Sequence, residues 1–339
     1  MIVIAGAGIV GAAIAYALRE SGHDTFILEK ERHMGCGISS RNSGVIHAGL
    51  YYPRESLKEE LCHAGRQRLY AFCREHKVPH KKTGKYVVAQ NTGEEEILYD
   101  ILKHAGHRVP LNLTTELPEG VRGTKALFSP ETGILDVTSA IEKMIELSGA
   151  TFLPGQKVAC VQSSNRHVAF KVNGETETCS YFFNACGLGA PLLAGMQQPK
   201  PHAKGSYFQI AVQPPYPIAS LIYPAVPRKS SSLGTHLTID MQGSLLLGPN
   251  LRWVDELDYK VDLSEKEAFF KSASRFLPWL KIGHLEPGYV GYRPKLAGPE
   301  FRDFMLKKQG RALHCLGIES PGITSSLALG EKAREMMGL

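Results

Sequence analysis

Three glycines among the first eleven residues have the spacing of a phosphate-binding turn. Gly6, Gly8 and Gly11 form the pattern G-x-G-x-x-G, in which the first allows a tight turn, the second lets the backbone approach a diphosphate and the third permits close packing of a helix on a strand. Glu29 lies 18 positions beyond Gly11, where an acidic side chain can accept hydrogen bonds from ribose hydroxyls. The residues predict a dinucleotide site, and Glu29 argues against a 2′-phosphate.

The motif alone does not distinguish FAD from NAD, and three later features favour FAD. Ala15 and Gly22 are small at further helix positions, a pattern similar to flavoprotein fingerprints. A second glycine cluster, Asn184-Ala-Cys-Gly-Leu-Gly-Ala190, closes another apolar strand, as expected when several stretches contact a long cofactor. Gly317-Ile-Glu-Ser-Pro-Gly322 leads a strand into the C-terminal helix, whose positive end would stabilise a reduced, anionic flavin. An ordinary strand-to-helix turn explains this last segment equally well.

The elements that position the first motif are a strand, a helix and a second strand. Residues 2–5 are a short apolar strand, helical spacing continues to Leu18, and residues 25–28 form the next strand, which ends at Glu29. The uncharged run 1–18 superficially resembles a signal peptide or a membrane span. Its three glycines and its end at Arg19-Glu20 instead predict a buried strand that runs into a helix.

The rest of the chain alternates between two kinds of pattern. Helical periodicity predicts helices at about 56–76, 94–104, 137–148, 264–277 and 323–337. Apolar runs predict strands at 85–89, 157–162, 167–172, 181–185, 206–212, 233–240, 244–248 and 312–316. The two ends of the sequence therefore predict alternating strands and helices, and its middle predicts mainly strands.

This distribution predicts an α/β (α+β) protein. A Rossmann-like dinucleotide-binding domain is assembled from separate stretches, and a mainly antiparallel substrate domain is inserted between them. The expected nucleotide domain comprises residues 1–80, 134–200 and 284–339, and the expected substrate domain comprises residues 81–133 and 201–283.

Composition sets the broad class of the protein. With 339 residues, 43% hydrophobic and 21% charged, the chain is an ordinary globular one rather than disordered, collagenous or coiled-coil. The net charge of +6 suits an anionic small molecule or a membrane surface and is too weak to predict nucleic-acid binding. Seven scattered cysteines without a C-x-x-C favour a reducing compartment. We expect a cytoplasmic protein with no integral membrane segment and at most peripheral contact with the inner face of a membrane.

A basic stretch between residues 54 and 85 holds nine Lys or Arg against four Glu. It reads as a solvated helix face, with guidance of acidic substrates or contact with anionic lipid as alternatives. Cys62, Cys73, His76 and His80 invite a zinc interpretation. Because Cys62 and Cys73 would lie about 16 Å apart along one helix, they cannot share a metal, and no metal site is expected.

Six segments together resemble the D-amino-acid-oxidase-like FAD-dependent oxidoreductases. They are Ser39-Ser-Arg-Asn-Ser-Gly-Val-Ile-His-Ala-Gly-Leu-Tyr-Tyr-Pro53, Lys204-Gly-Ser-Tyr-Phe208, His236-Leu-Thr-Ile-Asp240, Leu247-Gly-Pro249, Arg293-Pro-Lys-Leu-Ala-Gly-Pro299 and Gly317-Ile-Glu-Ser-Pro-Gly-Ile-Thr-Ser-Ser326. Within that family the chain is most similar to the L-2-hydroxyglutarate dehydrogenase branch, from Ile2 to about Lys332.

This resemblance implies a D-amino-acid-oxidase type of fold with FAD as cofactor. It implies oxidation of a C–H bond beside a hydroxyl or amino group, with electrons passed to an acceptor other than NAD, such as a quinone or oxygen. The expected cofactor contacts are Gly6, Gly8, Ile9, Val10, Gly11, Glu29, Lys30, Ser40, Asn42, Ser43, Gly44, Val45, Val158, Cys186, Gly187, Gly317, Ser320, Pro321, Gly322, Ile323 and Thr324.

The implied reaction needs a base and a carboxylate clamp. His47 is the first candidate for the base, because it follows the Ser/Gly loop and related flavoproteins carry a histidine at the matching place. His236 is the second, and either histidine could instead only bind the cofactor or pack in the core. Arg293 is the expected clamp because a guanidinium binds a carboxylate in bidentate fashion.

Further side chains complete the expected substrate site. Lys204 or Lys295 is a candidate for a second carboxylate, and four tyrosines are candidate hydrogen-bond donors: Tyr51, Tyr52, Tyr207 and Tyr292.

The favoured substrate is a small 2-hydroxy acid, L-2-hydroxyglutarate above others, which would be oxidised to the 2-oxo acid. An amino-acid oxidase or dehydrogenase on the same scaffold, and a flavin-binding protein without turnover, stay as alternatives.

Overall fold

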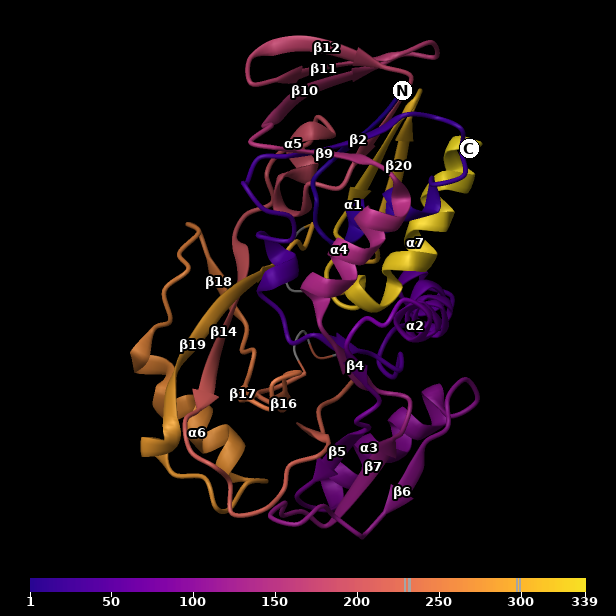
Figure 1. The fold of residues 1–339 in the computed structure, drawn as a ribbon. Helices are drawn as coiled ribbons and strands as arrows, with labels where there is room; N and C mark the ends of the chain where they lie inside the picture. Colours follow the sequence, from indigo (N-terminus) through magenta and orange to yellow (C-terminus); the bar gives the residue numbers. More distant parts are fainter. Residues whose placement is uncertain (229, 231–232, 297, 299) are drawn as a thin grey trace.

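A six-stranded sheet forms the upper half of the molecule in Figure 1. The computed structural model describes residues 1–339 except 229, 231, 232, 297 and 299. The strand order is β20 (Met305–Gln309), β21 (Ala312–Leu316), β13 (Tyr181–Asn184), β1 (Ile2–Ala5), β2 (Thr25–Glu29) and β9 (Thr151–Pro154). All neighbouring pairs are parallel except β20–β21. Every residue of β1 is at most 2% exposed, as expected for a parallel strand that is covered on both faces.

Four helices pack together on one side of this sheet: α1 (Ile9–Ala17), α2 (Leu57–Glu75), α4 (Val137–Ser148) and α7 (Gly322–Met337). Glycines permit the closest crossings. A Cβ on Gly330 of α7 would lie 2.4 Å from the Ala13 carbonyl oxygen, and one on Gly65 of α2 would lie 2.3 Å from the Thr324 carbonyl oxygen. The start of α2 is fixed by Ser56, whose Oγ accepts from the N–H of Glu59.

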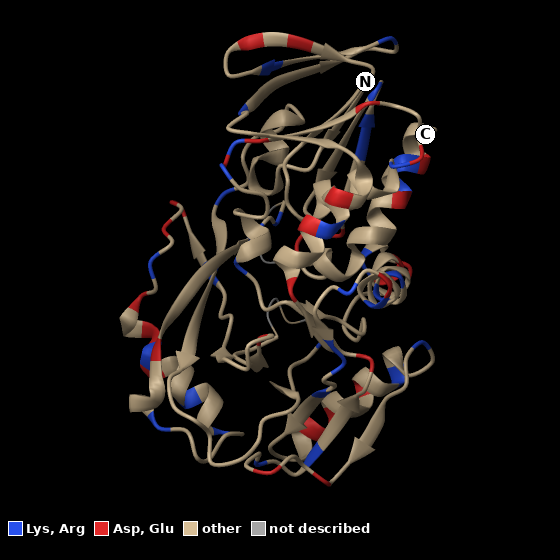
Figure 2. Cartoon of the chain, in the orientation of Figure 1, with Lys and Arg blue, Asp and Glu red and all other residues tan. Residues whose placement is uncertain are grey.

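A small antiparallel sheet covers the opposite face. It consists of β10 (Val158–Ser163), β11 (Val168–Val172) and β12 (Glu175–Cys179). Phe170 packs on Phe182 of the parallel sheet, with 5.4 Å between ring centroids. Strand β12 carries exposed acidic side chains (Figure 2), which discourage pairing with another chain at this edge.

The lower half of the molecule is built on a nine-stranded mixed sheet (Figure 1). Its main path runs β18 (Arg252–Val254), β14 (His202–Ile210), β17 (Leu245–Leu247), β16 (Leu237–Ile239), β15 (Leu221–Pro224), β5 (Lys85–Ala89), β7 (Lys125–Ser129) and β6 (Asn112–Thr114), and β19 (Leu285–Arg293) also pairs with β14. Only the β5–β15 pair is parallel among the described strand pairs of this sheet. Helices α6 (Lys266–Ser274) and α3 (Thr92–Ala105) contribute to its cores.

A three-stranded sheet lies between the halves, in the order β3 (Val45–Ile46), β8 (Gly133–Leu135) and β4 (His80–Lys81). Short elements complete the chain: α5 (Ala190–Leu193), η1 (Ile38–Ser40), η2 (Gly187–Gly189), η3 (Leu263–Glu265) and η4 (Ile282–His284). The predicted α/β class, with a parallel nucleotide-type sheet and a mainly antiparallel second sheet, is confirmed. The domain boundaries stay a prediction, and β19, which they assign to the nucleotide domain, pairs with β14 in the lower sheet.

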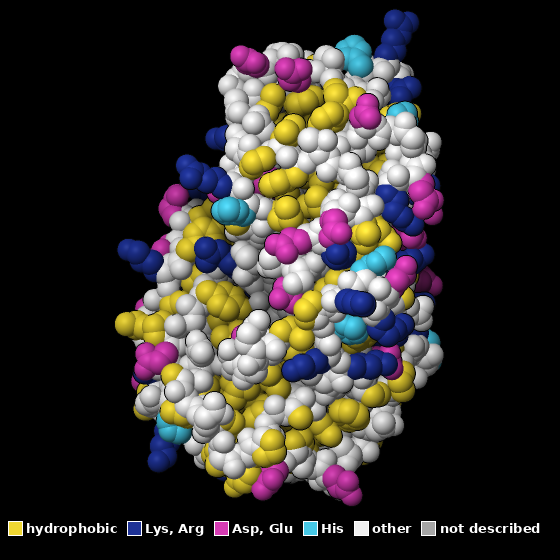
Figure 3. All heavy atoms as spheres, in the orientation of Figure 1, with side chains coloured by type: hydrophobic (Ala, Val, Ile, Leu, Met, Phe, Trp, Pro, Cys, Tyr) yellow, Lys and Arg dark blue, Asp and Glu magenta, His cyan; other side chains and the backbone are white. Residues whose placement is uncertain are grey.

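The surface in Figure 3 shows Lys and Arg side chains gathered near α2, which Figure 2 shows end-on with charges of both signs. In the part of the chain that the structure describes, no helix has both the length and the apolar character needed to cross a bilayer.

Candidate active site

A cavity of about 1230 Å³ lies where the two halves meet, and residues of both sheets line it. This volume exceeds the roughly 300–1,000 Å³ of most small-ligand pockets. The cavity therefore has room for a dinucleotide and a small substrate together.

The first glycine motif forms one wall. Gly6 has a φ of +102°, and a Cβ there would lie 2.5 Å from the Ala185 carbonyl oxygen. Gly8 has no side chain to cap α1, the Ile9 N–H donates to Ser39 Oγ, and the helix start faces the cavity, where it suits an anion. Gly6, Gly8, Ile9 and Val10 line the cavity. Gly11 does not, because it packs where a Cβ would lie 1.9 Å from the Gly6 carbonyl oxygen.

Glu29 closes the same wall at the end of β2. Its Oε2 accepts from the N–H of Ala7 at 2.9 Å, and its Oε1 accepts from the N–H of Glu31 at 3.0 Å. Glu29, Lys30 and Val158 all line the cavity. A carboxylate fixed in this way retains acceptor capacity for hydroxyl groups.

The second glycine cluster lies next to the first motif. Cys186 and Gly187 line the cavity, and the Cys186 Sγ donates to the Ala5 carbonyl oxygen at 3.3 Å. Burial raises the pKa of the Cys186 thiol to about 12, so this sulfur is an uncharged packing group.

A loop before β3 forms the adjoining wall. Asn42, Ser43, Gly44 and Val45 line the cavity, while the Ser40 hydroxyl lies outside the lining and donates to the Gly37 carbonyl. The missed residue here is Ser39, whose Oγ accepts from the N–H of Ile9 at 3.0 Å. It belongs to the segment that carries the family resemblance.

The N-terminus of α7 is a second open helix start. Pro321 caps this helix without a side-chain hydrogen bond, and Ser320, Pro321, Gly322 and Ile323 line the cavity. Gly317 and Thr324 do not line it. The Thr324 Oγ1 instead accepts from the N–H of His47 at 2.9 Å, which joins the helix to the loop before β3.

His47 lies beside this helix start. Its Nε2 is 3.2 Å from the Ser320 Oγ, which in turn is 3.4 Å from the hydroxyl of Tyr52. Burial, with smaller contributions from Lys85 and His236, lowers the pKa of His47 to about 3. The imidazole is therefore neutral near pH 7 and can accept a proton.

His236 faces the same cavity from the lower sheet. Its ring stacks on Tyr223, with 3.8 Å between centroids and 15° between planes, and its Nδ1 lies 2.9 Å from the Gly234 carbonyl oxygen. Burial lowers the pKa of His236 to about 3, against the effect of the Gly234 contact, and Lys85 and Arg293 lower it further.

Arg293 and Tyr207 line the cavity from paired strands, β19 and β14. The two terminal nitrogens of Arg293 each lie 3.4 Å from the Asn250 carbonyl oxygen. Among the described residues no carboxylate forms an ion pair with this guanidinium, so it can take one from a ligand. The Tyr207 hydroxyl lies 3.0 Å from the Ser43 Oγ, and burial raises the pKa of Tyr207.

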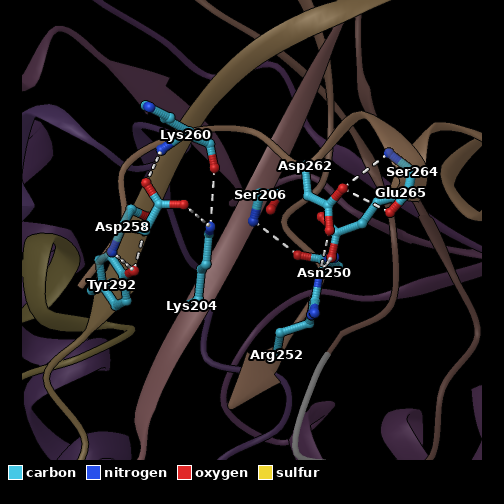
Figure 4. A network of polar contacts seen from close by, with 10 residues as sticks. All are labelled: Lys204, Ser206, Asn250, Arg252, Asp258, Lys260, Asp262, Ser264, Glu265 and Tyr292. Carbon is cyan, nitrogen blue, oxygen red and sulfur yellow. Dashed lines mark hydrogen bonds and ion pairs between the residues drawn. The ribbon is translucent and has the colours of Figure 1, made fainter. Parts of the chain in front are cut away.

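The two candidate lysines are both engaged elsewhere. Lys204 lies outside the cavity lining, where its Nζ donates to the Lys260 carbonyl at 3.0 Å and lies 3.6 Å from Asp258 (Figure 4). Lys295 lines the cavity and pairs with Glu319 at 3.1 Å. Ala297 and Pro299 of the same motif lie outside the described residues.

Sequence reasoning named Tyr51, which lines the cavity, but missed other polar residues there: Lys58, Tyr223 and Glu319 line it, and Lys85 lies behind Tyr51 and Tyr223. Burial alone would raise the pKa of Glu319, but Lys58 and Lys295 outweigh it and hold that pKa below its ordinary value. A signal existed for Lys85, which opens the otherwise apolar strand Lys85–Ala89.

Comparison with known proteins identifies FAD-dependent oxidoreductases as relatives of this chain. The sequence profile of the family described as "DAO: FAD dependent oxidoreductase" matches residues 1–336. The chain is 35% identical to the mitochondrial L-2-hydroxyglutarate dehydrogenase of Arabidopsis thaliana, covering 97% of this chain and 81% of that protein. It is 28% identical to the L-2-hydroxyglutarate dehydrogenase of Escherichia coli K12, covering 97% and 90%.

Solved structures show the same fold. FAD-bound L-α-glycerophosphate oxidase from Mycoplasma pneumoniae superimposes with a TM-score of 0.89 at 20% identity, covering 100% of this chain and 94% of that one. Glycine oxidase from Geobacillus kaustophilus superimposes with a TM-score of 0.84 at 19% identity, covering 99% and 94%. The profile match over residues 1–336 and the 35% identical relative show that the chain belongs to the DAO family of FAD-dependent oxidoreductases.

Proposed function

We propose that this protein oxidises a 2-hydroxy acid to the 2-oxo acid with FAD, and that its substrate is L-2-hydroxyglutarate. The observation that carries the proposal is the neutral, half-buried imidazole of His47 in the same cavity as the guanidinium of Arg293, which has no ion pair among the described residues. The relatives named L-2-hydroxyglutarate dehydrogenase support the choice of substrate.

The walls of the cavity fit FAD. The open start of α1 at Gly8 suits the diphosphate, and Glu29 suits the ribose of the adenosine half. The open start of α7 at Gly322 suits the pyrimidine end of the flavin ring, where negative charge collects on reduction. Bound FAD would supply the hydride acceptor for the substrate carbon.

The protein supplies the remaining requirements of the reaction. Arg293 binds the carboxylate next to the reacting carbon and so fixes the orientation of the substrate. His47 accepts the hydroxyl proton at a ring nitrogen, since its imidazole is neutral near pH 7 and lies in the same cavity as Arg293. Ser320 holds the ring through a hydrogen bond at Nε2. In the tautomer that carries the proton on Nε2, Ser320 accepts this N–H and Nδ1 is the basic atom.

The rival function on this scaffold is oxidation of an amino acid. Glycine oxidase among the structural neighbours fits that alternative in fold. A neutral amine already carries its own lone pair, so amino-acid oxidation would not depend on His47 as a base.

The test is anaerobic mixing of the purified, FAD-loaded protein with a panel of 2-hydroxy and amino acids. Bleaching of the visible flavin band by L-2-hydroxyglutarate, with 2-oxoglutarate as product, is the expected result. Bleaching by amino acids alone would establish the rival function, and bleaching by no member of the panel would favour a flavin protein without turnover.

The acceptor that reoxidises the flavin is proposed to be a quinone or oxygen, and the protein to be cytoplasmic with at most peripheral membrane contact. All seven cysteines lie in the described part of the chain and are free, which supports a reducing compartment. Turnover with a soluble quinone, compared with oxygen consumption in the same preparation, distinguishes the two acceptors.

A further inference from the structure

Lys85 is a buried amine that has no ionic partner in the part of the chain that the structure describes. It begins β5 and is 1% exposed. Its Nζ lies over two aromatic rings, with the Tyr223 centroid at 4.8 Å and the Tyr51 centroid at 5.2 Å. The titratable groups close enough to interact with it are Cys62, His47 and His236. Buried charges are almost always paired. Contact with two rings compensates only part of the lost hydration, so the site is incomplete without an anion.

The strand register places Lys85 directly behind residues that line the cavity. Strand β5 pairs with β15 so that Lys85 lies opposite Leu221 and Val87 opposite Tyr223. Side chains two residues apart share a face, and Lys85 and Tyr223 therefore lie on the same side of the sheet. The Tyr223 ring is stacked in turn on His236, and both Tyr223 and His236 line the cavity. The Tyr223 ring thus contacts both the Lys85 amine and the His236 ring.

A second unsatisfied donor lies beside the ammonium group. The Tyr51 hydroxyl is buried and has no hydrogen-bond partner among the described residues, although Tyr51 lines the cavity. Buried hydroxyls are normally hydrogen-bonded. The amine and the hydroxyl lie at one place and neither has an acceptor among the described side chains, which indicates that the missing acceptor comes from a ligand.

The two lysines that the sequence offered for a second carboxylate, Lys204 and Lys295, both have other partners. Lys295 is paired with Glu319 and Lys204 with Asp258. The cations whose charges act on His236 are Lys85 and Arg293, and neither has an ion pair in the described part of the chain. His236 therefore lies near two cations that have no anionic partner.

We propose that Lys85 and the Tyr51 hydroxyl bind the second carboxylate of a dicarboxylic 2-hydroxy acid whose first carboxylate is held by Arg293. The pair selects dicarboxylic over monocarboxylic substrates. This inference rests on the proposed function and names the residues that recognise the far end of its substrate.

Two variants test the pair directly. Lys85→Met keeps the length and the apolar contacts of the stem and removes the charge, and Tyr51→Phe removes only the hydroxyl. Lys82→Met is the matched control, because Lys82 is three positions away, half exposed and paired with Glu131. The FAD content of each purified variant is measured first.

The readout is the ratio of kcat/KM for L-2-hydroxyglutarate to that for L-2-hydroxypentanoate, which lacks the second carboxylate. Loss of a charged hydrogen-bonding partner should lower this ratio by about 100-fold or more in Lys85→Met and by about 10-fold in Tyr51→Phe. Lys82→Met should keep the wild-type ratio. An unchanged ratio in Lys85→Met, with both substrates lost equally or neither affected, would overturn the inference.

Binding of glutarate gives a readout that does not need turnover. Glutarate carries two carboxylates and no oxidisable hydroxyl, and its binding can be followed by the perturbed flavin spectrum and by the rise in Tm. Wild type should bind glutarate more tightly than pentanoate, and Lys85→Met should bind the two equally. If wild type oxidised no hydroxy acid, the proposed function would fail, and the glutarate comparison would still decide for or against the Lys85 site.

Discussion

The Nε2 of His47 lies 3.2 Å from the Oγ of Ser320, although the two residues are 273 positions apart. The contact joins the loop before β3 to the start of α7. A further link at 3.4 Å connects Ser320 to the hydroxyl of Tyr52. The histidine is thus held at the edge of the cavity by the segment that also forms the open helix start.

Replacement of His47 should remove the base and leave the cofactor site intact. We expect His47→Ala to lower kcat by about 10²–10⁴-fold, the usual contribution of a positioned acid or base, with FAD content and Tm close to wild type. Anaerobic flavin bleaching by the hydroxy acid measures the rate. His167→Ala, an exposed histidine on the small antiparallel sheet side, is the control. A loss below about threefold would contradict the assignment of His47 as the base.

The two cavity histidines, His47 and His236, should make stability depend on pH. Burial lowers the folded-state pKa of both His47 and His236 to about 3, whereas the unfolded chain titrates near pH 6.5. The unfolded state then binds more protons below about pH 6.5, so stability is complete above that pH and falls as the pH drops.

Each histidine should contribute a slope of about 1.4 kcal/mol per pH unit in this range. Urea unfolding of wild type and His236→Phe between about pH 7 and pH 4.5 measures it. Phenylalanine preserves the stacking on Tyr223. The variant should lose stability less steeply than wild type, and identical slopes would show that His236 titrates normally in the folded state.

The glycine motif gives a prediction on cofactor loading. A Cβ at Gly11 would lie 1.9 Å from the Gly6 carbonyl oxygen, so Gly11→Ala should force α1 away from β1 and reduce both FAD content and Tm. Gly283→Ala is the control, because a Cβ there meets no atom within 4 Å. Normal FAD content in Gly11→Ala would refute the role given to this turn.

The motifs around the cofactor were predictable because their chemistry is local. The turn at Gly6 and the acidic end of β2 need only the strand, helix and strand that the first 29 residues contain. The placement of His47 and Arg293 in one cavity followed from the resemblance, since no local pattern brings these distant segments together.

The missed strands have tertiary causes. Strand β19 contains Pro287, Gly288 and Gly291, which read as a loop. The structure shows why glycine is needed there: a Cβ on Gly288 would lie 2.8 Å from the Tyr207 carbonyl oxygen, and one on Gly291 would lie 2.2 Å from the Arg41 carbonyl oxygen. Those neighbours lie far away in sequence, as do Tyr51 and Tyr223 from Lys85.

A buried charge cluster supports the wall of the cavity. Glu319 lies 2.8 Å from Lys58 and 3.1 Å from Lys295, and all three side chains are at most 9% exposed. Removal of the carboxylate leaves two buried ammonium groups without a partner. Glu319→Ala should therefore lower the free energy of unfolding by about 3–5 kcal/mol, measured by urea denaturation at neutral pH.

The control for this cluster is Glu300→Ala, whose side chain is 79% exposed and 3.7 Å from Arg302. That change should alter stability by less than about 0.5 kcal/mol. Because the lysines hold the pKa of Glu319 below its ordinary value, its contribution is present above the unfolded pKa and is lost as the pH falls through the folded one. Equal losses of stability in Glu319→Ala and Glu300→Ala would mean that the ion pairs of Glu319 with the two lysines do not stabilise the fold.

Recognition of the second carboxylate should weaken in alkaline solution. Burial lowers the pKa of Lys85 to about 7, and a bound carboxylate requires the protonated amine. The Kd of glutarate should therefore rise above about pH 7, by up to about tenfold per pH unit, until the pKa of the complex is reached. Flavin spectral titration between about pH 6 and pH 9 measures this dependence, with pentanoate as the ligand that should not show it. Lys85→Arg supplies the decisive comparison, because arginine stays charged throughout this range. Glutarate binding to this variant should be independent of pH. The same alkaline loss of binding in wild type and Lys85→Arg would show that the titrating group is not Lys85.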